Sequence, residues 1–246
     1  MHINVRTSEE IEIMRQGGLI SKAALDAVLE KVKPGVTLLE LDAVAEQTIK
    51  RLGATASFKT VDDYPFATCI NVNEGIVHGL PSERVVEVGD ILSIDLGALY
   101  KGFHTDLSYT LEVGTDKETK FLAVGKKALE LAITACVLGN TIGDIGSEIQ
   151  NTIERAGYSV SRELVGHGVG KELHEDPYVP GYGRKGKGLP LKEGMVLAIE
   201  VIYQRGRPAL ALEADDWTIR TADKSLSALF EDTVAITKAG PLVLTR

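Results

Sequence analysis

The stretch GDILSIDLGALYKGFHTDLS, residues 89–108, alternates apolar and polar side chains on both sides of a short turn. Alternation with a period of two is typical of paired β-strands. A hairpin turning at residues 100–102 would place Asp95 opposite Asp106, since both lie about equally far from the turn. Two cross-strand carboxylates repel each other without a counterion. The hairpin therefore either faces solvent or binds a cation.

Three more polar residues interrupt segments that otherwise look buried. Glu200 ends the apolar run 195–199, Glu231 interrupts the run 226–236, and His167 lies in the glycine-rich GHGVG at 166–170. Taken singly, each is more often a surface acid or a structural histidine. Together with the two aspartates they would cost several kcal/mol apiece if buried without a partner. An oxygen-rich set with one imidazole is more typical of a site for two divalent ions such as Mn, Fe or Co than of a zinc site with thiolate ligands.

The chain also repeats itself at a shift of 104 residues. Nine of 32 gapless pairs are identical between residues 22–53 and 126–157. Thr37 with Glu40 forms a capping box before an apolar helical face, Leu38, Leu41, Ala45, Ile49 and Leu52, and Gly53 ends that helix. Thr141 and Asp144 begin the second copy. Duplication explains this recurrence in register, although any two amphipathic helices that stop at glycine share some of it.

Strands follow each helical pair. They are expected at residues 67–72, 90–96 and 104–111, and then at 195–202, 209–212, 217–220 and 226–236. This order predicts an α+β protein in which two halves, roughly 8–112 and 113–240, share one curved antiparallel sheet with helices on one face. No linker separates the halves, so residues 1–246 are expected to form a single domain. The segment 181–190 has four glycines but lacks the pattern of a phosphate-binding P-loop, and we expect a surface loop.

Composition narrows the class of partner. Lys and Arg number 27 against 35 Asp and Glu, which gives a net charge of −8 and disfavours nucleic-acid binding. The two cysteines, Cys69 and Cys136, provide no disulfide framework. The start lacks the pattern of a secretory signal, and the longest apolar stretch, around 131–138, is too short to span a bilayer. We expect a cytoplasmic protein with no membrane partner.

Five stretches resemble the methionine aminopeptidases of the bacterial, type I class, which are metallopeptidases with the pita-bread fold. They are CINVNEGIVHGLP (69–81), GDILSIDLGALYKGFHTDLS (89–108), ELVGHGVGKELHEDP (163–177), GMVLAIE (194–200) and WTIRTADKSLSALFEDT (217–233). The resemblance extends over nearly the whole chain. The positions that bind metal in that family are occupied here by the expected residue types, namely Asp95, Asp106, His167, Glu200 and Glu231. The pseudo-twofold halves of the pita-bread fold also account for the repeat.

The resemblance implies hydrolysis of the N-terminal methionine from peptides and nascent proteins by a hydroxide that bridges two divalent ions. Asp106 and Glu231 would each bridge the ions, Asp95 would hold one, and His167 with Glu200 would complete the other. Glu200 would also accept a proton. Ligand chemistry alone does not separate Mn, Fe, Co and Zn.

Further roles come from the same family motifs. His174 would stabilise the oxygen charge that develops during attack, and His78 would hydrogen-bond the substrate near the scissile amide. Both histidines would contact substrate, and Tyr64, Cys69 and Trp217 would line the side-chain pocket. Without the motif, each histidine is more often structural. The implied partners are peptide or nascent-chain N-termini, close to the ribosome, and the protein is expected to be a monomer.

Specificity is where the chain departs from the family pattern. Family members usually have a proline at Val201, a glycine at Thr105, a histidine at Asp232 and an aromatic residue at Leu173. Phe58 and Val61 replace a cysteine and a tyrosine of the pocket loop. No departure removes a metal ligand, but one misfitted methylene changes discrimination by about 1–3 kcal/mol. Selectivity for methionine therefore depends on positions at which this chain differs from the family pattern.

Two other functions stay open. A Pro-specific peptidase or creatinase-like hydrolase shares the fold and ligands, but such enzymes generally carry an extra N-terminal domain, and here the first repeat starts within about twenty residues of Met1. A non-catalytic binding module of the same fold would usually have lost ligands, and this chain keeps all five.

Overall fold

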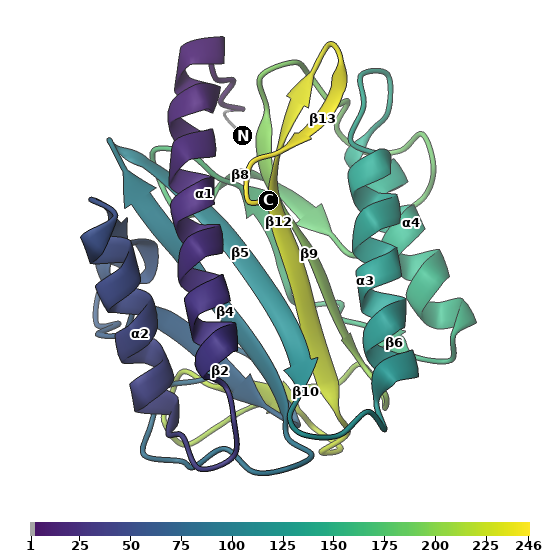
Figure 1. Cartoon of the computed structure of the whole chain (residues 1–246). Coiled ribbons are helices and arrows are strands. Elements are labelled where there is room, and N and C mark those ends of the chain that lie inside the picture. Colours follow the sequence, from purple (N-terminus) through teal and green to yellow (C-terminus); the bar gives the residue numbers. More distant parts are fainter. Residues whose placement is uncertain (1–2) are drawn as a thin grey trace.

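Two pairs of helices cover one face of a large antiparallel sheet in the computed structural model, which describes residues 3–246 (Figure 1). The helices are α1 (Ser8–Lys31), α2 (Leu38–Arg51), α3 (Thr119–Thr134) and α4 (Ile142–Arg155), with a short 3-10 helix η1 (Ser57–Thr60). Within residues 3–246, none of the helices has the length and apolar character needed to cross a membrane. The expected α+β class is confirmed.

The predicted capping boxes start both second helices. The Thr37 hydroxyl accepts from the Glu40 N–H while the Glu40 carboxylate accepts from the Thr37 N–H, and Thr141 with Asp144 repeats the pattern at α4. Leu52, the last member of the predicted apolar face, is not buried with the other four. It lies at the C-cap, where the chain leaves the helix, and its side chain is 38% exposed.

Thirteen strands occur within residues 3–246. In chain order they are β1 (Thr55–Ala56), β2 (Thr68–Val72), β3 (Gly75–Val77), β4 (Ile91–Tyr100), β5 (Phe103–Glu112), β6 (Ser159–Val160), β7 (Val165–Gly168), β8 (Glu175–Pro180), β9 (Val196–Gln204), β10 (Leu210–Leu212), β11 (Ile219–Thr221), β12 (Ser227–Thr237) and β13 (Gly240–Val243). Ten form the main sheet, whose principal order is β1-β4-β5-β12-β9-β7-β8. The expected strands at 209–212 and 217–220 belong instead to a separate sheet of order β10-β11-β3. The segment 181–190 contains no strand or helix, as expected.

The central hairpin has a different register from the one expected. Tyr100 pairs with Phe103, so the turn contains only Lys101 and Gly102, both with positive φ. Such a two-residue turn matches the twist of its strands. Its centre lies further along the chain than a 100–102 turn would put it, and Asp95 is therefore opposite Ser108, not opposite Asp106. Asp106 is opposite Gly97, on the same face of the sheet.

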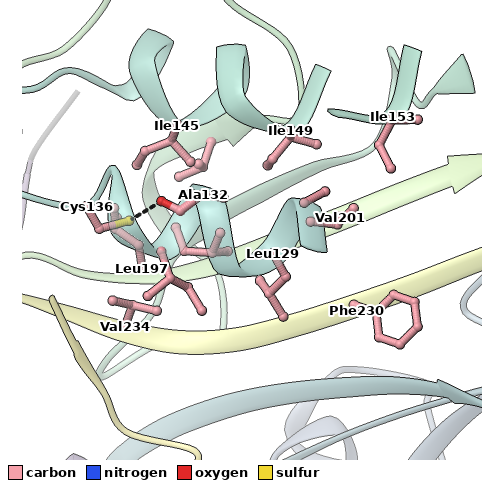
Figure 2. Packing of buried hydrophobic residues seen from close by; sticks show 14 of the residues in the cluster. Leu129, Ala132, Cys136, Ile145, Ile149, Ile153, Leu197, Val201, Phe230 and Val234 are labelled. Carbon is pink, nitrogen blue, oxygen red and sulfur yellow. Dashed lines mark hydrogen bonds between the residues drawn. The ribbon is translucent and has the colours of Figure 1, made fainter. Parts of the chain in front are cut away.

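The helices leave the other face of the sheet available for polar side chains. Leu129, Ala132 and Cys136 of the α3 region, with Ile145, Ile149 and Ile153 of α4, pack on Leu197, Val201, Phe230 and Val234 of β9 and β12 (Figure 2). On the same face of the sheet, α1 and α2 pack on Leu92, Ile94, Leu96 and Leu107 of β4 and β5. Because side chains alternate along a strand, residues 95, 106, 200 and 231 point away from the helices.

Candidate metal centre

Five neighbouring strands carry the five acidic and histidine residues singled out in the sequence. Asp95 lies on β4, Asp106 on β5, Glu231 on β12, Glu200 on β9 and His167 on β7. Glu231 is directly opposite Glu200 on one side and Ser108 on the other. All five side chains line a single cavity. Residues up to 136 positions apart in the chain therefore converge because their strands are adjacent in the sheet.

Four of these five side chains, those of Asp106, His167, Glu200 and Glu231, lie within a few ångströms of a neighbour in the set. Nε2 of His167 lies 3.5 Å from Oε1 of Glu200 and 3.9 Å from Oδ2 of Asp106. Ligand atoms of Asp106, His167 and Glu231 all lie within 4.8 Å of one another. The His167 Nδ1 is 2.8 Å from the Gly168 carbonyl, a contact that requires Nδ1 to carry the proton. The Nε2 lone pair then faces the carboxylates, as in a metal-ligating histidine.

Burial and mutual repulsion make this cluster electrostatically unfavourable by itself. Burial raises the pKa of Asp95 to about 7. Burial and the neighbouring carboxylates raise the pKa values of Asp106, Glu200 and Glu231 well above their ordinary range. Burial, with His174 nearby, lowers the pKa of His167 to about 4.

Two buried carboxylate oxygens in the cluster lack hydrogen-bond donors within the part of the chain that the structure describes, which indicates whether a cation fits there. Oδ1 of Asp95 and Oε1 of Glu231 are buried and have no hydrogen-bond partner among residues 3–246. The other Glu231 oxygen accepts from Ser108 Oγ at 2.9 Å. Buried acceptors without donors, beside a neutral imidazole, are suited to divalent cations. The residues present therefore fit the divalent metal chemistry inferred from the sequence.

Two more histidines line the same cavity. The His174 ring lies 4.5 Å from that of His167, centroid to centroid, in an edge-on arrangement. His78 follows β3 with a φ of 57°, and the Gly79 N–H beside it donates to Asn71 Oδ1 at 2.8 Å. Burial lowers the pKa values of both His78 and His174. Both imidazoles are thus neutral near pH 7 and each offers one N–H donor and one acceptor.

An apolar pocket adjoins the cluster. Tyr64 donates its hydroxyl to the Thr68 carbonyl at 2.8 Å and lies 3.1 Å from Cys69 Sγ, and its ring packs edge-on against Trp217 at 5.0 Å. Phe58, Val61 and Leu173 are among the other apolar side chains around it. The structure thus brings together Tyr64, Cys69 and Trp217, and three of the departures from the family pattern lie in the same wall.

The remaining departures lie outside the cavity. The Thr105 hydroxyl pairs with that of Ser21 on α1 at 2.9 Å. Asp232 is buried on the helix side of β12 and accepts from Thr245 Oγ1 and from the Arg246 guanidinium. Val201 packs among the α3 and α4 side chains. Each substitution has its own packing or polar partner, so none disturbs the cluster directly.

Sequence reasoning missed one polar residue of the cluster. Ser108 donates to Glu231, and its place on the same strand face as Asp106 was a signal that could have identified it. It also missed Arg6 and Glu175, which form a buried ion pair next to His174. Neither gives a sequence signal, because an arginine and a glutamate 169 positions apart look like ordinary surface charges.

Comparison with known proteins adds independent information. The model of Metallopeptidase family M24 matches residues 12–238. Methionine aminopeptidase of Clostridium acetobutylicum is 43% identical over 246 residues, covering 99% of this chain and 98% of the relative. Methionine aminopeptidase 1 of Bacillus subtilis is 42% identical over 243 residues, with 98% of each covered.

Solved structures give the same grouping. A methionine aminopeptidase from Thermotoga maritima superimposes with a TM-score of 0.97 at 40% identity, with both chains fully covered. A prolidase from Pyrococcus furiosus reaches a TM-score of 0.80 at 30% identity, covering 98% of this chain but 65% of that one. The shared part of the prolidase thus corresponds to almost all of the present chain.

Proposed function

Because the chain belongs to metallopeptidase family M24 and has its pita-bread fold, we propose that it is a methionine aminopeptidase, a metalloaminopeptidase that hydrolyses the first peptide bond of chains beginning with methionine. The observation that carries this proposal is the set of five ligand-type side chains on five neighbouring strands, next to an apolar pocket. The full-length likeness to methionine aminopeptidases supports it.

The ligand set would hold two divalent ions. Asp106 and Glu231 would be shared between them, Asp95 would serve one, and His167 and Glu200 the other. When bound, such ions polarise a carbonyl oxygen and lower the pKa of water, supplying a nucleophile at neutral pH. Mn, Fe, Co and Zn all suit carboxylate and imidazole ligands.

The protein's own groups would then manage protons and position. Glu200 would accept the proton released by the attacking water, since its carboxylate lines the cavity in which that water would bind. His174 would donate a ring N–H to the oxygen on which charge develops, and His78 would hydrogen-bond the substrate beside the scissile amide. Neutral histidines suit both tasks, because each retains a donor without adding a positive charge near the cations.

The pocket would take the methionine side chain. Tyr64, Cys69 and Trp217 would contact it together with Phe58, Val61 and Leu173, all of which line the cavity that contains the carboxylates. Thioethers pack well against aromatic rings, which supports methionine as the preferred side chain. The altered wall residues would set how strictly other side chains are rejected.

Peptide hydrolysis tests the proposal directly. Purified protein supplied with two equivalents of Mn or Co should cleave Met-Ala-Ser and not Ala-Pro, lose that activity on chelation and regain it when metal is added back. Preferential cleavage of Ala-Pro or Met-Pro would identify the Xaa-Pro hydrolase that the likeness to prolidase leaves as the second candidate. No cleavage of any of these peptides by fully metallated protein would contradict both and favour a binding module.

We also propose the setting of the reaction. Nascent chains emerging from the ribosome in the cytoplasm would be the substrates, and a monomer would act on them. Sedimentation analysis of the pure protein and co-sedimentation with ribosomes test these two points separately.

A further inference from the structure

The loop that carries His174 lies between β7 and β8, at residues 169–174. The His174 ring has no hydrogen-bond partner among residues 3–246, although it lines the cavity beside His167. Its direction is therefore set by the backbone of its loop and by packing, not by a hydrogen bond to the ring. Whatever holds that backbone determines where the ring N–H points.

Glu175, the next residue, organises the loop. Its Oε1 accepts from the backbone N–H groups of Lys171 at 2.8 Å and of Glu172 at 3.2 Å. The Gly170 N–H donates to the Glu172 carbonyl at 3.0 Å, and the Gly170 carbonyl accepts from the His104 N–H at 2.7 Å. One carboxylate thus binds two backbone N–H groups of the loop that carries His174, and Gly170 near the start of this loop is hydrogen-bonded to β5.

The countercharge for Glu175 comes from the segment before α1. The Arg6 guanidinium donates to both Glu175 oxygens, and Asn4 Nδ2 donates to Oε2 at 2.7 Å. The two charged side chains are only 7% and 6% exposed. The Arg6 N–H in turn donates to the Gly194 carbonyl at 2.7 Å, just before β9.

Glycine at position 170 makes this contact feasible. A Cβ there would lie 2.0 Å from Nη2 of Arg6, so only glycine lets the guanidinium approach the loop backbone. Burial raises the pKa of Glu175, but hydrogen bonds from Asn4 and the Glu172 N–H, with the Arg6 charge, outweigh it and leave the pKa below its ordinary value. Glu175 is therefore ionised at neutral pH and the pair is a charge-assisted one.

We propose that Arg6 and Glu175 are positioning residues for His174, holding its loop so that the imidazole N–H points at the reacting oxygen. Neither residue touches the substrate; both act through the backbone of residues 170–174. The inference rests on the proposed function for the role of His174, but the geometry on which it depends is that of this chain. It predicts that the N-terminal segment affects turnover without affecting metal binding.

The test compares Arg6→Gln, Glu175→Gln, the double variant and Arg6→Lys as holoenzymes. Loss of the pair should lower kcat roughly ten- to hundredfold, because an ångström-scale misplacement of a catalytic group has effects of that order. KM and metal content should stay within about twofold of the unmodified protein. The double variant should be no worse than either single one, because both remove the same interaction. Arg6→Lys should recover part of kcat.

A matched control and a spectroscopic readout separate positioning from general damage. Arg162→Gln removes an exposed arginine paired with Glu154 and should leave kcat unchanged. In the zinc-loaded protein, which is diamagnetic, the His174 ring resonance should shift or split in Arg6→Gln and Glu175→Gln but not in Arg162→Gln. This readout needs no substrate, so it remains informative if the unmodified protein fails to cleave methionine peptides and the proposed function falls.

Several results would overturn the inference. These are an unchanged kcat with an unchanged ring resonance in folded Arg6→Gln, parallel loss of metal and activity, or additive losses in the double variant. If Arg6→Gln does not fold, Asn4→Ala removes a single donor to Glu175 and decides the matter: a shifted ring resonance with lowered kcat supports the inference, and an unshifted one contradicts it.

Discussion

Glu231 is the residue on which the dinuclear assignment depends most. It is buried, its neighbours are acids, and one of its oxygens lacks a partner among residues 3–246. As a shared ligand it would be needed by both ions, so Glu231→Ala should abolish turnover and reduce bound metal, measured by peptide hydrolysis and elemental analysis. Glu193→Ala, at an exposed surface pair with Lys238, is the control. An active, fully metallated Glu231→Ala variant would refute the assignment.

His174 should separate catalysis from metal binding. Its ring lies beside His167 but comes from a loop, whereas the ligands come from strands. We expect His174→Ala to lower kcat roughly a hundredfold, in the range seen when one oxyanion donor is removed, while metal content stays near that of the unmodified protein. If metal is lost together with activity, His174 is a ligand and its assigned role is wrong.

The Glu175 carboxylate makes a pH-dependent contribution to stability. Its folded-state pKa lies below the ordinary value of 4.5, mainly because hydrogen bonds and Arg6 overcome the effect of burial. A depressed pKa stabilises the fold above the unfolded-state pKa, and this stabilisation is lost as pH falls through the folded-state value. In chelated protein, the stability lost through Glu175→Gln should therefore be full at pH 7 and shrink below about pH 4.5, which urea denaturation at several pH values would measure. A loss that is constant down to pH 3 would contradict this.

At this scale the sequence was most informative where a residue broke a pattern. Glu200 and Glu231 stand out because an apolar strand has no local reason to contain an acid, and Gly-flanked His167 stands out similarly. Arg6 and Glu175 break no pattern. Their pairing exists only because β8 and the segment before α1 meet in space, and no local signal reports such a contact.

At the scale of elements, strands were easier to place than their registers. The expected strands 90–96 and 104–111 agree with β4 and β5 to within one residue at three of the four ends and stop four residues short at the end of β4. The turn holds two residues rather than the three expected. The register of a hairpin is fixed by its turn, and the choice depends on positive φ angles at Lys101 and Gly102. The small sheet β10-β11-β3 was likewise beyond local pattern, because β3 pairs with a strand more than 140 residues away.

Helix α3 offers a test of how tightly the helical layer is packed on the sheet. A Cβ at Gly125 would lie 2.5 Å from Tyr203 and 2.6 Å from Phe230, and both rings are fully buried. Alanine gains about 1 kcal/mol over glycine in helix propensity, but overpacking a core typically costs about 1–3 kcal/mol. With the clash this close, Gly125→Ala should destabilise the protein and lower Tm by several degrees, measured by calorimetry. Lys127→Ala, on the exposed side of the same helix, should change Tm little. An unchanged or raised Tm for Gly125→Ala would mean that the helix can move away from the sheet.

At the scale of the whole molecule, the site joins segments from both halves of the chain. Asp95 and Asp106 precede residue 112, whereas His167, Glu200 and Glu231 follow residue 165, and the contact between these groups is the pairing of β5 with β12. The repeat at 104 residues predicted two such halves from sequence alone, and the boundaries at 8–112 and 113–240 stay a prediction. The repeat could not indicate which strands meet at the junction, because that depends on the order of strands in the folded sheet.

The convergence of ligands from both halves of the chain predicts that metal stabilises the strands where the halves meet more than it stabilises the periphery of the molecule. A ligand that binds only the folded state raises stability by RT ln(1 + [L]/Kd), about 2.7 kcal/mol at a free concentration of 100 Kd. Chelation should therefore lower Tm, and Mn or Co should restore it in a concentration-dependent way. Hydrogen exchange should show the change in β5, β9 and β12, which carry Asp106, Glu200 and Glu231, and much less in α2, which carries no ligand. The Glu231→Ala variant is the matched control, since its Tm should respond weakly to added metal. An equal response in that variant would place the stabilising ion elsewhere, because the junction ligands would then be dispensable for the effect.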